Sequence, residues 1–421
     1  MKPRPRRAAP AGPRRLRTWS GAVLALHALA LPGAGLAADW PTRHRSASGY
    51  ELAVKGLYQF QFEQVDDARA HPRTGAPWLA DHGAWRRKEF GLSAKAPWGV
   101  ELALGYDFTV RNGVHPGGWL DNYLRYTSPR IGAWRLGQFK TPVGLDATNS
   151  SSATTFIERA LPVQAIGMGR RLGIDWTHAG AGPWLLQAAW FAGGDLNGDN
   201  DGHGPALRAV WTPLRDVGDT TTVLHLGLAL SRERRSASRD GRGLRQLAVA
   251  RFRARPETGL GSARLVDSGV LPQPGAIDRI GLELAWIDGP WLVQGEYLRV
   301  TTRPHSAPRF TGTGWYLQGA WLLTGASRPW SKGTIGNAPA RGPWGAFELA
   351  LRCSALDLDD GPVRGGHQRD WTLGANWYLD RHFKLQANYI RARSRRHYGG
   401  AVGRVLDVDP AILEARIQLQ F

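Results

Sequence analysis

Hydrophobic and polar residues alternate one by one along several stretches of the chain. In residues 50–63, one face is aliphatic and aromatic and the other is charged or amide: Leu52, Val54, Tyr58, Phe60 and Phe62 against Lys55, Gln59, Gln61 and Glu63. The same alternation recurs in residues 100–111, 371–380 and 411–421. A period of two is that of a β-strand, because successive side chains point to opposite faces. The pattern predicts an all-β protein.

Alternation fits two architectures, a soluble sandwich with one wet face and a transmembrane barrel. The segment lengths favour the barrel, because about 9–14 residues suffice to cross a bilayer at a tilt. Bulky charges on the polar face suit a watery lumen, and 19 tryptophans suit the aromatic girdles of a barrel. We therefore expect a transmembrane antiparallel β-barrel whose last strand ends on Phe421, in an apolar register.

The alternating segments give a strand count. We find seventeen candidates: 50–63, 86–97, 99–111, 118–127, 131–140, 169–177, 183–192, 204–213, 220–232, 244–255, 276–288, 290–303, 312–324, 343–356, 369–380, 382–394 and 409–421. A bacterial single-chain barrel has an even number of strands, so one candidate is false or one is missing. We assign 244–255 to a loop, because a long irregular stretch follows it. The prediction is a barrel of 16 strands, with 18 as the alternative.

Four Pro-Trp pairs support this assignment. They open candidate strands at Trp98, Trp184, Trp291 and Trp344. Without 244–255 these strands are the third, seventh, eleventh and thirteenth, so all four tryptophans lie at one edge of the bilayer. With it, the last two move to the opposite edge. Tryptophan belts lie at membrane interfaces, and a shared edge is the simpler arrangement.

A segment of 28 residues, 141–168, separates two of the predicted strands. Thr141-Pro142 ends the first strand, because proline cannot donate to a ladder. Residues 154–162 fit about one and a half helical turns, with Thr155 as the N-cap and Pro162 as the stop. Connections this long inside a compact array are usually functional.

Residues 1–37 are typical of a secretory signal. Seven basic residues precede a short apolar core at 21–31, and small residues at 35 and 37 suit cleavage after Ala37. Residues 38–421 would then form the barrel domain. Their net charge is +12 (47 − 35), after removal of seven of the 54 basic residues and no acidic ones. A basic balance fits nucleic acid, an acidic membrane surface or an anionic solute, and export argues against nucleic acid.

The segment around 141–168 carries three motifs in order. They are Gly-Gln-Phe-Lys-Thr-Pro at 137–142, Phe-Ile-Glu-Arg-Ala-Leu-Pro at 156–162 and Gly-Arg-Arg-Leu-Gly at 169–173. The chain resembles the phosphate-selective porins, porins O and P, of Gram-negative outer membranes. The likeness runs from about 130 to 421 and departs at 326–342, where Ala326 stands at a position expected to be acidic. The resemblance implies an inward-folded constriction loop, an outer-membrane location and a homotrimer.

A pore of this kind needs fixed positive groups, because an anion that enters a narrow opening loses water. The candidates at the constriction are Lys140, Arg159, Arg170 and Arg171. Alternate spacing puts a second set, Arg251, Arg253 and Arg255, on one side of an extended segment, about 7 Å apart. If that loop folds inward, it forms a ladder of positive charge; otherwise it faces lipopolysaccharide phosphates. Other lumen charges are expected at Lys55, Lys95, Arg125 and Arg208.

Enzymatic and metal-binding motifs are missing from the sequence. The twelve histidines show no zinc spacing, and there is no Gly-x-Ser-x-Gly elbow or P-loop. We expect no cofactor, no metal and no enzyme activity; a barrel lipase would need an outward Ser/His pair. The expected function is a water-filled, anion-selective diffusion channel, for inorganic phosphate, polyphosphate or other small anions. The alternative is a general or differently selective porin on the same barrel.

Overall fold

The computed structural model describes residues 40–66, 79–111, 115–198, 200–218, 220–235, 237–239, 245–304, 307–340, 342–398 and 404–421. The predicted export signal at 1–37 lies outside these residues. Among the described residues no helix has the length and apolar character to cross a membrane.

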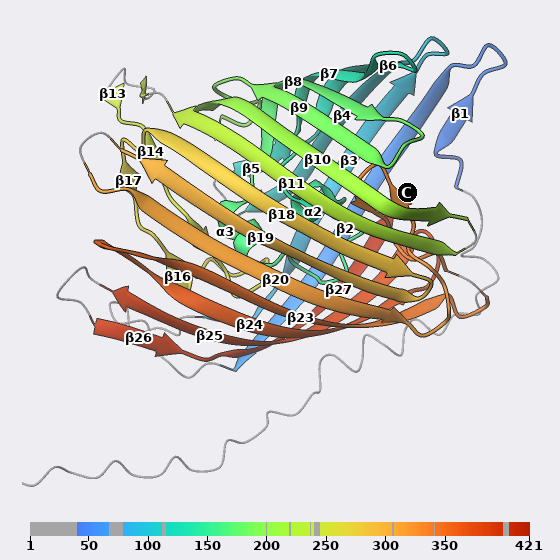
Figure 1. The fold of residues 1–421 in the computed structure, drawn as a ribbon. Coiled ribbons are helices and arrows are strands. Elements are labelled where there is room, and N and C mark those ends of the chain that lie inside the picture. Colours follow the sequence, from blue (N-terminus) through green and yellow to red (C-terminus); the bar gives the residue numbers. More distant parts are fainter. Residues whose placement is uncertain are drawn as a thin grey trace, which may run out of the picture. The chain divides into compact units, whose positions relative to one another are not determined.

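Sixteen strands form the wall of a closed antiparallel barrel in the described part of the chain (Figure 1). They are β2 (Glu51–Asp66), β3 (His82–Lys95), β4 (Val100–Arg111), β6 (Asn122–Ser128), β7 (Gly132–Lys140), β8 (Arg170–Ala179), β9 (Trp184–Phe191), β10 (Gly202–Val217), β11 (Thr221–Arg235), β18 (Ala276–Asp288), β19 (Trp291–Arg303), β20 (Phe310–Leu322), β23 (Ala346–Asp360), β24 (Val363–Tyr378), β25 (Phe383–Tyr398) and β27 (Ala411–Gln420). Each pairs with the next, and β27 pairs with β2 to close the ring. The predicted 16 strands are confirmed.

Three short strands extend the wall. β1 (Arg43–Arg45) pairs with the start of β2, β5 (His115–Trp119) precedes β6, and β26 (Arg404–Val408) precedes β27. The turns at the end where the chain terminates are mostly short, and the opposite end carries several long loops. Since barrels of this kind have short periplasmic turns, the chain terminus marks the periplasmic end.

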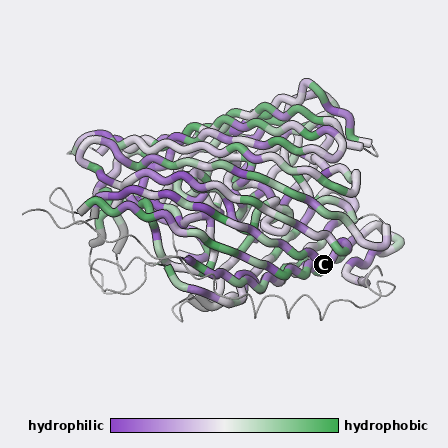
Figure 2. Tube along the Cα trace, turned by 90° about the horizontal axis from the view of Figure 1, so that it is seen from below, coloured by the Kyte–Doolittle hydropathy of each residue, from purple (hydrophilic) through white to green (hydrophobic). Residues whose placement is uncertain are grey.

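The wall has an apolar outside and a polar inside. On β24 the outward Trp371 and Leu373 are 50% and 56% exposed, whereas the inward Asp370 and Thr372 are fully buried. Figure 2 shows this alternation of hydrophobic and hydrophilic positions along the wall strands. A water-soluble protein has the opposite arrangement, so the outer face is built for lipid.

The four Pro-Trp tryptophans occupy one edge of this wall. They stand at the starts of β4, β9, β19 and β23, which all run in the direction of β2 in the antiparallel order. All four side chains are exposed. The predicted common edge is therefore confirmed, and it is the periplasmic one.

The segment 244–255 is not a wall strand, as predicted. It lies in the connection between β11 and β18, where three two-residue ladders form within the loop. These pair β12 (Ser238–Arg239) with β13 (Arg245–Gln246), β14 (Val249–Ala250) with β17 (Leu271–Pro272), and β15 (Arg253–Ala254) with β16 (Val266–Asp267). A fourth ladder, β21 (Trp330–Ser331) with β22 (Thr334–Ile335), lies in the connection from β20 to β23.

The predicted helix at 154–162 is wrong. The segment 141–169 contains two short helices, α2 (Leu145–Thr148) and α3 (Leu161–Ile166), and residues 154–160 are not helical. Pro162 lies in the first turn of α3 instead of ending a helix. A proline is tolerated there because the first N–H groups of a helix have no intrahelical partner.

We predict that arginine is tolerated inside this barrel and not outside it. Leu373→Arg places a charge on the lipid face of β24 and should cost about 2–4 kcal/mol near the bilayer midplane. Thr177→Arg, at a position on β8 that lines the lumen cavity, should cost little. The measurement is the free energy of unfolding from lipid vesicles. Equal tolerance of the two changes would contradict the assignment of the faces.

Candidate pore and anion-binding surface

Three connections fold into the lumen and occupy one part of it. The first is 141–169, between β7 and β8; the second is 250–267, within the connection between β11 and β18; the third comprises 323–340 and 342–345, on the periplasmic side between β20 and β23. In Figure 1, α2 and α3 of the first connection lie within the ring of strands. The sequence prediction that 141–168 folds inward agrees with this arrangement.

Apolar contacts hold the first two connections together. Leu161 and Val163 of α3 pack in one buried cluster with Phe252 from the second connection. Val300 on β19 and Phe310 on β20 supply the wall side of the same cluster. The alternate residues of 250–254 thus face the protein interior, which leaves the arginines between them on the other side.

Buried ion pairs join the inserted connections to the wall. Glu158 accepts hydrogen bonds from Arg86 on β3 (2.8 Å) and Arg416 on β27 (2.7 Å). Burial alone would raise the pKa of the Glu158 carboxyl, but the neighbouring guanidiniums outweigh it and hold that pKa well below its usual range. In the second connection, Glu257 accepts from Arg352 on β23 (3.0 Å). Each pair fixes one inserted segment against a different part of the wall.

The start of 141–169 is fixed by a carboxylate of β19. The backbone N–H groups of Leu145 and Asp146 donate to the two oxygens of Glu296, at 2.8 and 2.7 Å. Gly144 approaches this carboxylate with φ +88°, and a Cβ there would lie 2.8 Å from the oxygen. Only glycine suits both that backbone conformation and that contact.

The periplasmic connection meets the first connection inside the lumen. The backbone N–H of Ile335 donates to the side-chain oxygen of Asn149 (3.0 Å). Arg328 donates to Glu348 on β23 (2.8 Å), and Arg208 on β10 donates to the carbonyl of Gly333 (2.9 Å). Burial lowers the pKa of Arg328, but the attraction of Glu348 is greater and raises it overall.

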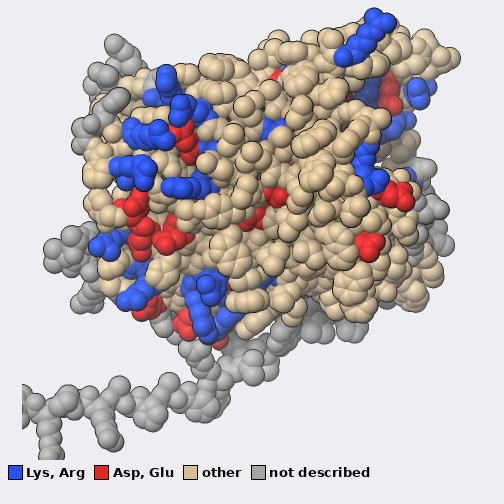
Figure 3. All heavy atoms as spheres, viewed as in Figure 1, with Lys and Arg blue, Asp and Glu red and all other residues tan. Residues whose placement is uncertain are grey.

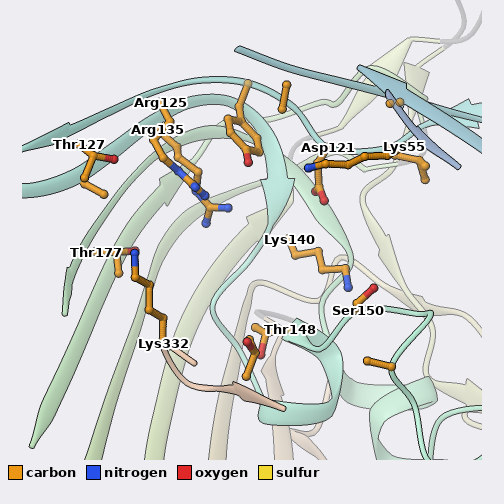
Figure 4. Close-up of a pocket in the computed structure, with 18 of the residues that line it drawn as sticks. Lys55, Asp121, Arg125, Thr127, Arg135, Lys140, Thr148, Ser150, Thr177 and Lys332 are labelled. Carbon is orange, nitrogen blue, oxygen red and sulfur yellow. The ribbon is translucent and has the colours of Figure 1, made fainter. Parts of the chain in front are cut away.

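A cavity of about 1610 Å³ occupies the other part of the lumen, along the wall from β2 to β10. Its lining includes eight basic side chains and two acidic ones: Lys55, Arg125, Arg135, Lys140, Arg170, Arg208, Lys332 and Arg381 against Glu89 and Asp121. Figure 4 shows part of this lining, with Arg125 and Arg135 side by side and the Lys140 ammonium directed toward Ser150. The surface of the cavity is therefore electropositive.

Arginines and lysines contribute to this charge in different ways. Several of the arginines pair with carboxylates: Arg125 with Glu101 (3.2 Å), Arg135 with Asp175 (2.8 Å), Arg170 with Asp121 (3.0 Å) and Arg208 with Glu283 (2.9 Å). Of those carboxylates, only Asp121 lines the cavity. Lys140 donates to the carbonyl of Asn149 (2.5 Å), and neither Lys55 nor Lys332 makes an ion pair with a described residue.

The predicted constriction residues separate into two places. Lys140 and Arg159 donate to the same carbonyl, that of Asn149, and Arg170 lies on the cavity next to Asp121. Arg171 lies apart from them and is buried. It stands 3.8 Å from Glu233, a carboxylate that also binds Arg279 on β18.

The second predicted set lies outside the cavity lining. Arg251 and Arg253 are exposed, and Arg251 donates to Asp267 within the same connection (2.8 Å). Arg255 is half-buried and donates to the carbonyl of Gly261 (2.6 Å). The structure thus does not bring these arginines together with Lys140.

Three basic residues of the cavity, Arg135, Lys332 and Arg381, were missed by the sequence analysis. Arg135 occupies a polar position of the alternating segment 131–140, so the same pattern that predicted the strand could have found it. Lys332 lies in a connection without periodicity, and no sequence signal placed it in the lumen. The described residues contain no group of three or more side chains suited to hold a metal ion.

A closed antiparallel barrel with an apolar outer face and connections folded into its lumen defines the porin class of outer-membrane channels. A family model described as phosphate-selective porin O and P matches residues 55–421. The chain belongs to this family, and the predicted resemblance is confirmed.

Two relatives match most of the chain. An uncharacterised protein of Caulobacter vibrioides is 29% identical over 359 residues, which cover 80% of this chain and 67% of that protein. Porin O of Pseudomonas aeruginosa is 26% identical over 355 residues, which cover 75% of this chain and 77% of that protein.

Solved porins share the fold at low sequence identity. OmpT of Vibrio cholerae is 9% identical with a TM-score of 0.57, over 90% of this chain and 99% of that chain. An anion-selective porin from Comamonas acidovorans is 12% identical with a TM-score of 0.53, over 88% of this chain and 100% of that chain. Because both identities are low, the similarity to these structures concerns the barrel fold only.

We predict that Arg328→Ala loosens the periplasmic connection. Arg328 is almost fully buried, and its loss leaves the buried Glu348 carboxylate without its cationic partner, which should cost about 3–5 kcal/mol. The measurements are the free energy of unfolding and the rate of proteolysis within 323–345. Lys332→Gln, an exposed change in the same connection, is the control and should leave both unchanged. Unaltered protease resistance of Arg328→Ala would contradict the anchoring role.

Proposed function

We propose that this porin is an anion-selective diffusion channel, and that phosphate or a polyphosphate is among its solutes. The observation that carries the proposal is the cavity lining, with eight basic side chains and two acidic ones. A permeating anion must exchange part of its water for such fixed positive groups, and weak, repeated contacts allow it to leave.

The kinds of residue in the lining support phosphate among small anions. A guanidinium can bind two oxygens of one phosphate in parallel, and an ammonium acts as a mobile point charge. Both kinds lie on the cavity, with the hydroxyl residues Thr148, Ser150 and Thr177 beside them. The family description and the name Porin O of one relative agree with this proposal.

The predicted site residues take different parts in this proposal. Lys140, Arg159 and Arg170 attract the anion where 141–169 narrows the lumen. Arg171 holds the wall through Glu233 and acts on the anion only at a distance. Arg251, Arg253 and Arg255 recruit anions at the external end, where solvent screens them. Residues 1–37 direct the chain to export and are then removed.

We also propose that the channel works as a homotrimer. Strands β7, β8 and β9 have 9, 10 and 8 residues, whereas β23, β24 and β25 have 15, 16 and 16. The lengths of β7, β8 and β9 barely reach the 9–11 residues that a tilted transmembrane strand needs. Neighbouring copies against it would shield its edges from lipid. A solved structure of Vibrio cholerae OmpT is described as a trimer form.

The selectivity proposal predicts the reversal potential of single channels in a salt gradient. The wild-type channel should prefer chloride over potassium. Lys140→Glu should lower that preference about fivefold or more, because a unit charge at 4 Å contributes about 1 kcal/mol even in bulk water. Millimolar phosphate should reduce the chloride current. A cation-selective wild type would refute the proposal, and a current that ignores phosphate would leave a general porin.

The control for this measurement is Arg251→Gln with Arg253→Gln. These changes remove two exposed charges outside the cavity lining. They should lower conductance at low salt and have little effect above about 0.1 M, where screening acts beyond about 10 Å. The reversal potential should stay near that of the wild type. A shift in reversal potential as large as that of Lys140→Glu would indicate that the selective site lies in the second connection, and would contradict the proposal.

The oligomer proposal predicts the mass of the detergent-solubilised particle. A homotrimer should have three times the mass of one chain after correction for bound detergent. Unheated samples should also migrate above the monomer in a denaturing gel. A particle with the mass of one chain would exclude the trimer and leave the selectivity proposal untouched.

A further inference from the structure

Charged side chains gather at the external end of the lipid-facing wall. In Figure 3 one group covers the end of the visible face where β14, β17 and β26 lie in Figure 1, a second group lies at the opposite end, and the band between them is mostly uncharged. Many of these charges form ion pairs with each other. On β11 and β19, for example, Arg232 and Arg303 both pair with Asp278 of β18, at 2.6 and 3.6 Å.

Two arginines within this band oppose each other. Arg369 on β24 and Arg393 on β25 are register partners on the outward face, and both are exposed. Like charges directly opposite each other destabilise a pair of strands. The register partner of Arg369 on β23 is Ala355, so that side supplies no carboxylate. Neither arginine makes an ion pair with a described residue.

The nearby acidic residues already serve other partners. Asp409 pairs with Arg391 (3.3 Å), Asp407 with Arg395 (3.7 Å) and Asp359 with His367 (3.8 Å). The two opposed guanidiniums therefore stand in the middle of a local excess of positive charge. This arrangement lacks a negative partner, which an anion from outside the chain would supply.

The position of the pair identifies the source of that anion. Trp371, the next outward residue on β24, lies about 7 Å closer to the middle of the wall than Arg369. Trp371 and Tyr389 are half exposed on the outer face, and Leu373 follows them. Aromatic girdles mark the boundary between the hydrocarbon core and the headgroups. The arginine pair thus lies at headgroup level on a face turned toward lipid.

We propose that Arg369 and Arg393 bind a phosphate group of an outer-leaflet lipid headgroup. A phosphate between the two side chains accepts hydrogen bonds from both guanidiniums. Its negative charge offsets the repulsion between the two positive charges. Arg391 and Arg395 lie two residues to either side of Arg393 and extend the basic surface along β25. The site lies on the outside of the barrel and is independent of the selectivity of the pore.

The test uses the purified full-length barrel in detergent, with lipid A that carries two phosphates as the probe. The double variant Arg369→Gln with Arg393→Gln should bind this lipid at least about tenfold more weakly, because the phosphate loses both charged hydrogen-bond donors. Arg232→Gln with Arg303→Gln removes two outward charges that already pair with Asp278, and should bind like the wild type. Dephosphorylated lipid A should bind the wild type as weakly as the double variant binds lipid A.

Folding and competition readings complete the test. Without lipid, the melting temperature of the double variant should equal or exceed that of the wild type, because the opposed charges are gone. Inorganic phosphate at millimolar concentration should not displace lipid A. Unchanged binding by the double variant, equal binding of dephosphorylated lipid, or displacement by inorganic phosphate would each overturn the proposal.

Discussion

Buried pairs of arginine and carboxylate between the inserted connections and the wall are the interaction on which this structure depends. A charge taken out of water costs several kcal/mol unless it is paired with good geometry. Glu158 therefore holds 141–169 against Arg86 and Arg416, and Glu257 holds the second connection against Arg352. Arg328 does the same for the periplasmic connection through Glu348. Shifting any of these segments would leave a buried charge alone.

This anchoring decides where the open space lies and what charge it presents. Within the lumen, α3 packs against β19, β20 and β23, and β16 packs against β23, β24 and β25, whereas the cavity follows β2 to β10. There, Asp175 and Glu283 hold arginines but do not themselves line the cavity, and the lysines make no ion pair with a described residue. The cavity therefore presents more basic than acidic side chains to the lumen.

The sequence predicted the barrel well because its signal is local. Alternation with period two gives strands, faces and, with the Pro-Trp pairs, a strand count that the structure confirms. The prediction failed where the structure depends on contacts between residues that are far apart in the sequence. The side chain of Arg416 donates to the carbonyl of Ile157, 259 positions earlier in the sequence, and no local pattern near either residue predicts that hydrogen bond. The helix prediction failed at Pro162 for the opposite reason, because proline fits a helix start as well as an end.

Candidate pore residues follow the same division. Lys140 and Arg170 stand at strand ends next to a long connection, and the structure places both on the cavity. Arg171 is adjacent to Arg170 in sequence, but it faces Glu233. Lys332 reaches the lumen because the segment 323–340 folds inward. Residue type and spacing predicted which positions carry positive charge. The packing of the three inserted segments determines which of these charges line the cavity.

The central claim is that solute passes along the basic side of the lumen and is excluded from the side filled by the inserted connections. Thiol modification tests it directly, in a background with Cys353→Ser. Thr177→Cys, on the cavity, should react faster with an anionic sulfonate reagent than with a cationic trimethylammonium reagent, and its current should fall. Thr372→Cys, fully buried beside Glu257, should stay unreactive. Faster reaction of Thr177→Cys with the cation, or ready modification of Thr372→Cys, would contradict the account.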